Sequence, residues 1–189
     1  MKEISTPVTK GLIIINVVVH LLGYIIAAIS LGNLSTSLLF GMYKGAMFLQ
    51  PYRLITSGFV HASILHLLSN MYMLYILGNL LEEKIGSVKF SVIYMFSLLG
   101  SSVIVNFLSG ASQLHVGASG AIWGLMTASL LYMVRSKNKA GTVALAQCLI
   151  INFIFSFSAG ISWQGHFGGG LSGLIIGSVC CNSNKDDSQ

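Results

Sequence analysis

Residues 117–134 read Gly117-Ala-Ser-Gly-Ala-Ile-Trp-Gly-Leu-Met-Thr-Ala-Ser-Leu-Leu-Tyr-Met-Val134. The apolar part of this stretch predicts a membrane helix, and Ser119 stands between glycines in its first turn. Glycine lets another backbone approach, and a helix start supplies unpaired N–H groups and the positive end of the helix dipole. A hydroxyl placed there can act as a nucleophile, and the N–H groups beside it can stabilise an oxyanion. Small residues also pack membrane helices, so the motif alone does not establish catalysis.

The composition is that of an integral membrane protein. Of 189 residues, 54% are hydrophobic and 8% are charged, whereas a soluble domain carries about 25% charged residues. The net charge of +5 is not gathered into a basic run, so it indicates membrane topology and no nucleic-acid partner. Cys148, Cys180 and Cys181 lack CxxC spacing and are expected to be core residues, with lipidation of Cys180 or Cys181 as an alternative.

Six apolar runs predict an all-α membrane protein, a six-transmembrane-helix bundle with spans at 11–31, 61–81, 90–108, 119–134, 142–157 and 166–181. The first run is longer than a signal-peptide core of about 7–15 residues, although a cleaved signal stays an alternative. Residues 32–60 form a long first loop in which Tyr52-Arg53 suits the membrane interface. The predicted organisation is an N-terminal arm (1–10), one membrane domain (11–181) and a tail (182–189).

Lys and Arg residues predict the orientation of these spans. An even number of spans places both termini on one side, and most of the cations fall on that side: Lys2, Lys10, Lys84, Lys89, Arg135, Lys137, Lys139 and Lys185. The other side holds Lys44 and Arg53. The positive-inside rule therefore predicts cytoplasmic termini. The lack of an Arg-rich transit peptide favours a bacterial plasma membrane.

Three polar residues are expected at one depth on three parallel spans. His66, Ser119 and His166 each lie about 24 Å above the inner end of their own run, taking 1.5 Å per residue. In a hydrocarbon core of about 30 Å they would share a level just below the outer surface. Stripes of small residues predict that the spans of Ser119 and His166 pack closely against each other. The stripes are Gly120, Gly124 and Ala128 on the first span, and Gly165, Gly169, Gly173 and Gly177 on and just before the second.

This arrangement predicts a serine–histidine dyad. Serine needs a base to accept its proton, and His166 is the candidate. All five acids lie at the inner side or in the tails, which excludes a Ser-His-Asp triad. Trp123, one turn after Ser119, is expected to pack against the imidazole. His66 and Asn70 share a helix face and, with the Ser119 backbone N–H, would donate to an oxyanion.

The sequence also contains other histidines and is compatible with other functions. His61 is interpreted as structural or loop-bracing, and His115 is given no role. A zinc site is disfavoured because there is no HExxH motif and no acid within the membrane, so neither a metal nor a cofactor is expected. A small-solute channel stays an alternative, since buried polar residues also line conduction paths.

The motifs together resemble those of the rhomboid family of intramembrane serine proteases, over nearly the whole chain. His61-Ala-Ser-Ile-Leu-His66-Leu-Leu-Ser-Asn70 is similar to the family's second-span pattern, and Gly78 and Glu82 follow at the expected places. Gly117-Ala-Ser-Gly120 matches its GxSG motif. The stretch from His166 through Gly169 to Gly173 matches its last-span pattern.

The resemblance implies a compact six-helix bundle that cleaves transmembrane protein substrates in the lipid bilayer. It implies Ser119 as nucleophile, His166 as general base, and His66, Asn70 and the Ser119 N–H as oxyanion donors. Gly117, Gly120, Trp123, Gly169 and Gly173 would support the site. Departures are Tyr52 for a usual Trp, Trp123 for a frequent Tyr, and Gly165 for a frequent Ala. An inactive binder of membrane proteins stays an alternative, and the oligomeric state is not predicted.

Overall fold

The computed structural model describes residues 5–158 and 160–181, and this part of the chain is an all-α bundle. Its long helices are α1 (Pro7–Ile29), α5 (Ile64–Ile85), α6 (Ser87–Leu108), α7 (Ser119–Arg135), α8 (Lys139–Phe155) and α9 (Trp163–Cys180). The first loop folds into short helices: α2 (Thr36–Phe40), α3 (Ala46–Leu49), α4 (Arg53–Thr56) and the 3-10 helix η1 (Ser57–Phe59). The predicted fold class is confirmed, while the predicted tail (182–189) lies outside the described residues.

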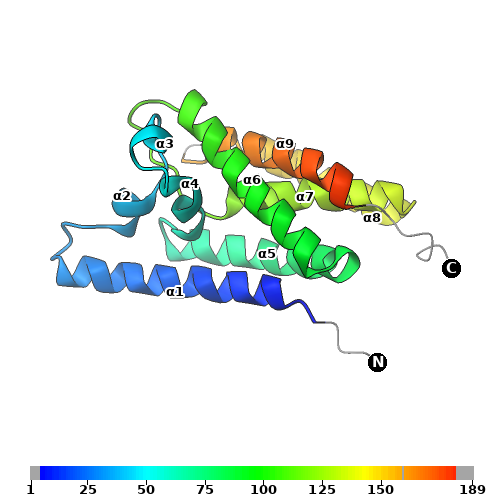
Figure 1. Cartoon of the computed structure of the whole chain (residues 1–189), viewed down its shortest axis with the longest axis horizontal. Coiled ribbons are helices and arrows are strands. Elements are labelled where there is room, and N and C mark those ends of the chain that lie inside the picture. Colours follow the sequence, from blue (N-terminus) through cyan, green and yellow to red (C-terminus); the bar gives the residue numbers. More distant parts are fainter. Residues whose placement is uncertain (1–4, 159, 182–189) are drawn as a thin grey trace.

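The long helices differ in how strongly they qualify as membrane spans. In the described part of the chain, α1, α5 and α6 are long and apolar enough to cross a membrane. Helices α7, α8 and α9 have 17, 17 and 18 residues, at the lower end of the range of about 17–25 residues for a span. Helix α1 begins and α9 ends at the same end of the bundle, as an even number of spans requires (Figure 1).

Several helices extend beyond the predicted apolar runs at that end. Helix α1 begins at Pro7 rather than Gly11, because a proline at the first helical position costs no hydrogen bond. Helix α5 continues past Glu82 to Ile85. Charged residues end an apolar run, but they do not end a helix, which explains both differences.

Glu82 joins the start of α1 to the end of α5. Its carboxylate accepts hydrogen bonds from the backbone N–H groups of Val8 (3.0 Å) and Thr9 (2.8 Å) and from the Thr9 hydroxyl (2.7 Å). Ser87, at the start of α6, donates a further hydrogen bond to it at 2.6 Å. Because a helix start carries unpaired donors and partial positive charge, this buried acid is satisfied without a cation.

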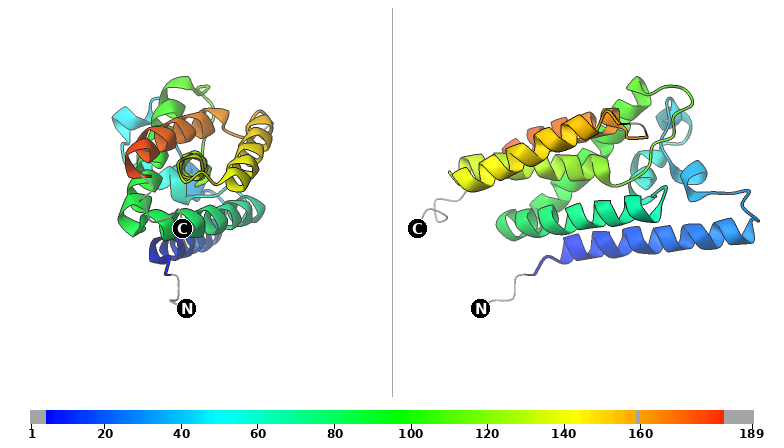
Figure 2. Two further views of the ribbon diagram at one scale, coloured as in Figure 1. Left: turned by 90° about the vertical axis from the view of Figure 1, so that its right-hand side faces the viewer. Right: turned by 180° about the vertical axis from the view of Figure 1, so that it is seen from behind.

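Helix α7 occupies the centre of the bundle. Viewed end-on, it lies among α5, α6, α8 and α9 (Figure 2), and it packs against all four. Most of its side chains are buried, from Gly120 near the start to Met133 near the end. Its first residue is Ser119, so the centre of the bundle carries the candidate nucleophile.

The two predicted small-residue stripes meet between α7 and α9. A Cβ atom added to Gly169 would overlap the carbonyl oxygen of Gly120, and one added to Gly173 would overlap that of Gly124. Further along, a Cβ on Gly177 would lie 3.0 Å from the Ala128 Cβ. The backbones of α7 and α9 therefore touch directly, which side chains larger than hydrogen would prevent.

The Arg53 side chain is buried inside the first loop and binds its backbone carbonyl groups. The residue is buried, and its guanidinium donates hydrogen bonds to the carbonyl oxygens of Gly41 (2.5 Å) and Leu38 (2.9 Å) and to the Gln50 side chain. It also lies over the ring of Tyr43, 5.1 Å from the centroid. The expected interfacial role of the Tyr52-Arg53 pair is thus corrected for Arg53, whose hydrogen bonds hold loop carbonyls together.

A single added methyl group tests the α7–α9 contact. We expect Gly169→Ala to lower the apparent Tm in detergent, because overpacking of this kind costs about 1–3 kcal/mol, more than the gain in helix propensity of about 1 kcal/mol. Gly170→Ala is the matched control, since its Cβ would meet Thr127 at an ordinary 3.5 Å. Equal Tm values for the two variants, measured by thermal unfolding, would contradict the direct backbone contact.

Candidate active site

A cavity of about 480 Å³ opens at the end of the bundle opposite to the start of α1. Its walls come from the first turns of α5, α7 and α9, the last turns of α8, and the loops that join them. The predicted residues that line it are His66, Asn70, Ser119, Trp123 and His166. The structure therefore brings together side chains from three separate sequence motifs.

The loop before Ser119 is held to distant parts of the chain. His115 and Met42 exchange two backbone hydrogen bonds of 2.7 and 2.8 Å, which form an isolated antiparallel bridge. The Gly117 N–H donates to the Ser57 carbonyl (2.9 Å), and the Ala118 N–H donates to Nε2 of His61 (3.4 Å). The interpretation of His61 as a loop brace is confirmed, and these bonds place Ser119 at the start of α7.

Gly117 meets two requirements that other residues do not. Its φ angle of +112° lies in a region that L side chains rarely adopt. A Cβ atom on it would also lie 2.7 Å from Nε2 of His66. Glycine therefore lets the loop turn into α7 while the His66 ring lies directly against its backbone.

His66 and Asn70 lie one turn apart on the cavity-facing side of α5. One Asn70 amide N–H donates to the His66 carbonyl at 2.8 Å, which orients the amide. Because an amide nitrogen carries two hydrogens, the other N–H can donate elsewhere. The His66 ring is braced edge-on by His61, with centroids 5.0 Å apart. Both side chains are thus held in place and retain a donor for the cavity.

His166, in the first turn of α9, stacks on Trp123 of α7. Their ring centroids are 5.2 Å apart and their planes are inclined by 21°. No hydrogen bond joins Ser119 to His166 in the described part of the chain, although both line the cavity. Catalytic hydrogen bonds are often long without substrate, so this geometry does not oppose a dyad.

A serine supplies the hydrogen-bond partner of the His166 ring. The Ser156 hydroxyl lies 2.7 Å from Nδ1 of His166. Among the described acids, Glu82 is bound to α1 and Glu83 pairs with Lys84 at 3.8 Å, both at the far end of α5. Ser156 lies at the end of α8, outside every motif, so no sequence pattern indicated it.

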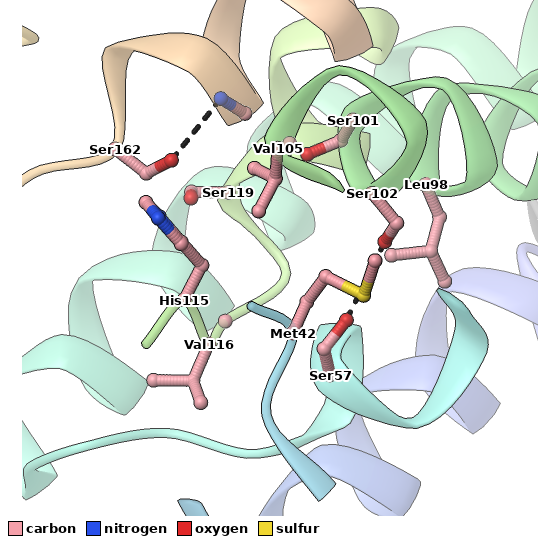
Figure 3. A pocket seen from close by; sticks show the side chains of 13 residues that line it. Met42, Ser57, Leu98, Ser101, Ser102, Val105, His115, Val116, Ser119 and Ser162 are labelled. Atoms are coloured by element: carbon pink, nitrogen blue, oxygen red, sulfur yellow. Dashed lines mark hydrogen bonds between the residues drawn. The ribbon is translucent and has the colours of Figure 1, made fainter. Parts of the chain in front are cut away.

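His115, for which the sequence predicted no role, lies on the cavity wall. It also borders a second cavity of about 30 Å³ that adjoins Ser119 and carries the hydroxyls of Ser101 and Ser162 (Figure 3). Burial lowers the pKa of His115, which favours the neutral ring. Its Nε2 is buried without a hydrogen-bond partner in the described residues. A cavity of this size and polarity has room for water.

The remaining supporting residues lie behind the cavity. Gly120 and Gly169 form the α7–α9 contact directly beneath Ser119 and His166, and Gly173 continues it one turn further. The described residues contain no cluster of three or more His, Cys, Asp or Glu side chains that could hold a metal. The polar side chains that line the larger cavity carry hydroxyls, imidazoles and amides.

Comparisons with known proteins give the family. Residues 49–183 match the family model of the Rhomboid domain. The chain is 32% identical over 136 residues to RHOMBOID-like protein 5 of Arabidopsis thaliana, covering 69% of this chain and 44% of that protein. It is 31% identical over 147 residues to Rhomboid-like protease 3 of Toxoplasma gondii, covering 72% and 53% respectively.

The chain thus spans about half the length of the curated relatives it matches. These relatives come from a plant and a parasite, so they lend no support to the expected bacterial origin, which stays a prediction. The match covers α5 to α9 and hence every residue that lines the larger cavity. On the fold, the motifs and this match, the chain is an integral membrane protein that belongs to the rhomboid family.

Proposed function

We propose that the chain is an intramembrane serine endopeptidase, with a Ser119–His166 dyad that cleaves transmembrane helices through an acyl-enzyme. The observation that carries the proposal is the shared cavity. One space of about 480 Å³ is lined by side chains from α5, α7 and α9, namely His66, Asn70, Ser119 and His166. Relatives named as proteases support the same activity.

The reaction follows from the chemistry of these groups. Nε2 of His166 takes the proton of the Ser119 hydroxyl while Oγ attacks the scissile carbonyl carbon. The resulting oxyanion accepts hydrogen bonds from His66, Asn70 and the Ser119 N–H. The His166 imidazolium returns the proton to the leaving amine as the C–N bond breaks. A water then attacks the acyl-enzyme by the same route and releases the carboxylic acid product.

A neutral dyad suits the location of the site. A buried carboxylate without partners is costly to desolvate, and in this bundle Glu82 is satisfied by four hydrogen bonds at the opposite end. The Trp123 ring instead restricts the imidazole by stacking. The small cavity beside Ser119 could supply the water for hydrolysis of the acyl-enzyme.

Substrate is proposed to enter past α8. No side chain of α8 is fully buried, and among the long helices it packs chiefly against α7 at the edge of the bundle (Figure 2). Asn152 of α8 nevertheless lines the cavity. A substrate helix must unwind before its carbonyl can be attacked, which favours Gly, Ser, Ala or Pro near the cleavage site.

The proposed orientation places both termini in the cytoplasm and the cavity toward the opposite surface. The helix ends that carry Lys84, Arg135 and Lys139 lie at the same end of the bundle as the start of α1 (Figure 1). The positive-inside rule assigns that end to the cytoplasm.

Cleavage of a single-span model substrate by purified protein in detergent tests the dyad. We expect wild type to cleave, and Ser119→Ala and His166→Ala to fall to the background of substrate alone, because each variant lacks one partner of the proton transfer. Ser129→Ala is the matched control on α7, since this buried hydroxyl has no hydrogen-bond partner in the described residues and lies outside the cavity.

Cleavage that persists in both dyad variants would contradict the assignment. Capture of the substrate without cleavage by wild type would favour an inactive binder. If neither cleavage nor capture is seen, solute flux in vesicles would test the channel alternative.

The oxyanion donors should affect the chemical step. We expect Asn70→Ala and His66→Ala each to lower kcat by about 100-fold with KM little changed, since a donor aimed at the oxyanion acts mainly in the transition state. Steady-state kinetics with circular dichroism as a folding check measures this. A rise in KM with unchanged kcat would instead assign these side chains to substrate binding.

The pH dependence should report the base. His166 must be neutral to accept the Ser119 proton, so the rate should rise with pH through the pKa of the imidazole and level off above it. The measurement is kcat/KM from about pH 8 down to the lowest pH at which the protein stays folded, under conditions in which chemistry is rate-limiting. A rate that stays level or rises as the pH falls to that limit would speak against a histidine base.

A further inference from the structure

Ser156 ends α8 with its side chain turned inward. The residue is the C-cap of the helix and is only 2% exposed, whereas its neighbours Phe157 and Ser158 are exposed. A serine at this position commonly bonds back to the carbonyl four residues earlier, and Ser156 does so, with its hydroxyl donating to Asn152 at 2.8 Å. That bond alone would make it an ordinary helix terminus.

A second contact gives Ser156 another role. Its oxygen also lies 2.7 Å from Nδ1 of His166, ten residues further along the chain. A hydroxyl has one hydrogen, and here that hydrogen is used on the Asn152 carbonyl. Both contacts are hydrogen bonds at once only if the Ser156 oxygen accepts from His166, and in that arrangement Nδ1 carries the hydrogen.

The direction of this bond decides which tautomer the histidine adopts. In a neutral imidazole one nitrogen carries the hydrogen and the other has the free lone pair. With the hydrogen on Nδ1, the lone pair is on Nε2, the nitrogen that the proposed dyad needs as proton acceptor. The opposite tautomer would present an N–H to the Ser119 hydroxyl and could not act as a base.

We propose that Ser156 is a positioning residue that holds His166 as its Nδ1–H tautomer, through the chain His166 Nδ1–H to Ser156 Oγ–H to the Asn152 carbonyl. The proposal rests on the dyad proposed above and deepens it. No proton moves to Ser156 during the reaction. When His166 becomes an imidazolium, its Nδ1–H bond to Ser156 becomes charge-assisted and strengthens, which favours the transition state.

Trp123 and Ser156 each restrict a different aspect of the orientation of the His166 ring. Stacking on Trp123 sets the plane of the imidazole but does not distinguish its two nitrogens. The hydrogen bond to Ser156 supplies that distinction. Because Ser156 and Asn152 belong to the last turn of α8, the orientation of the base depends on where that turn lies.

The test combines histidine NMR with kinetics on four variants of the full chain. Ser156→Ala removes the hydroxyl. Thr and Val side chains have nearly the same shape as each other, but only Ser156→Thr retains the hydroxyl. Ser158→Ala is the control for an exposed serine in the same loop. ¹⁵N-labelled histidine reports which ring nitrogen is protonated, and comparison with His166→Gln identifies the His166 signals.

We expect wild type, Ser156→Thr and Ser158→Ala to show Nδ1–H at His166. Ser156→Ala and Ser156→Val should shift toward the Nε2–H tautomer, and their kcat should fall about 3- to 10-fold with KM unchanged, as for loss of one hydrogen bond. An Nε2–H tautomer in wild type, or a fall in kcat in Ser156→Val without a tautomer change, would overturn the proposal. The two proposals can fail separately. If wild type cleaves no substrate but its His166 is the Nδ1–H tautomer and loses that tautomer in Ser156→Ala, the positioning role would be upheld and the protease function refuted.

Discussion

The direct backbone contact between α7 and α9 is the constraint on which the rest of the structure depends. Gly120 and Gly124 meet Gly169 and Gly173 with no space for a Cβ atom. In a bilayer there is little hydrophobic force between helices, so close van der Waals packing must hold them together. The same contact fixes the separation of the two helix starts, and therefore of Ser119 and His166. Packing and site geometry are consequences of one interface.

The polar groups of the bundle are separated toward its two ends. At one end Glu82 accepts four hydrogen bonds that join α1, α5 and α6. At the other end the cavity contains imidazoles, hydroxyls and an amide, and neither described acid lies among its lining residues. A charge at a helix start is stabilised by the dipole, whereas an unpaired one in a cavity between helices is not. Neutral groups that orient one another, such as His166 and Ser156, are an arrangement that this environment permits.

The loops determine how accurately the site is built. Ser119 is the first residue of α7, and the loop before it is held by Met42, Ser57 and His61. Met42 and Ser57 belong to the first loop, and His61 is the first residue of the second-span pattern. Arg53 in turn holds the first loop together through its backbone carbonyls. The long connection between α1 and α5 thus supports the loop before α7. Within that loop, Gly117 has no side chain, so the His66 ring can lie against its backbone.

The fold class, the long helices and the residues that meet in the cavity could all be predicted from the sequence. Hydropathy and helical periodicity are local signals, and they were sufficient to predict that the stripes of Gly120 and Gly169 would face one another. Helix ends were misjudged where charges continue a helix, as at Glu82. The positions of Ser156 beside His166, of His115 on the cavity wall and of Arg53 among the loop carbonyls came from the tertiary structure alone. Their partners lie in loops or helix ends without a repeating pattern, and a hydrogen bond such as that between Ser156 and His166 depends on how two helix ends approach in space.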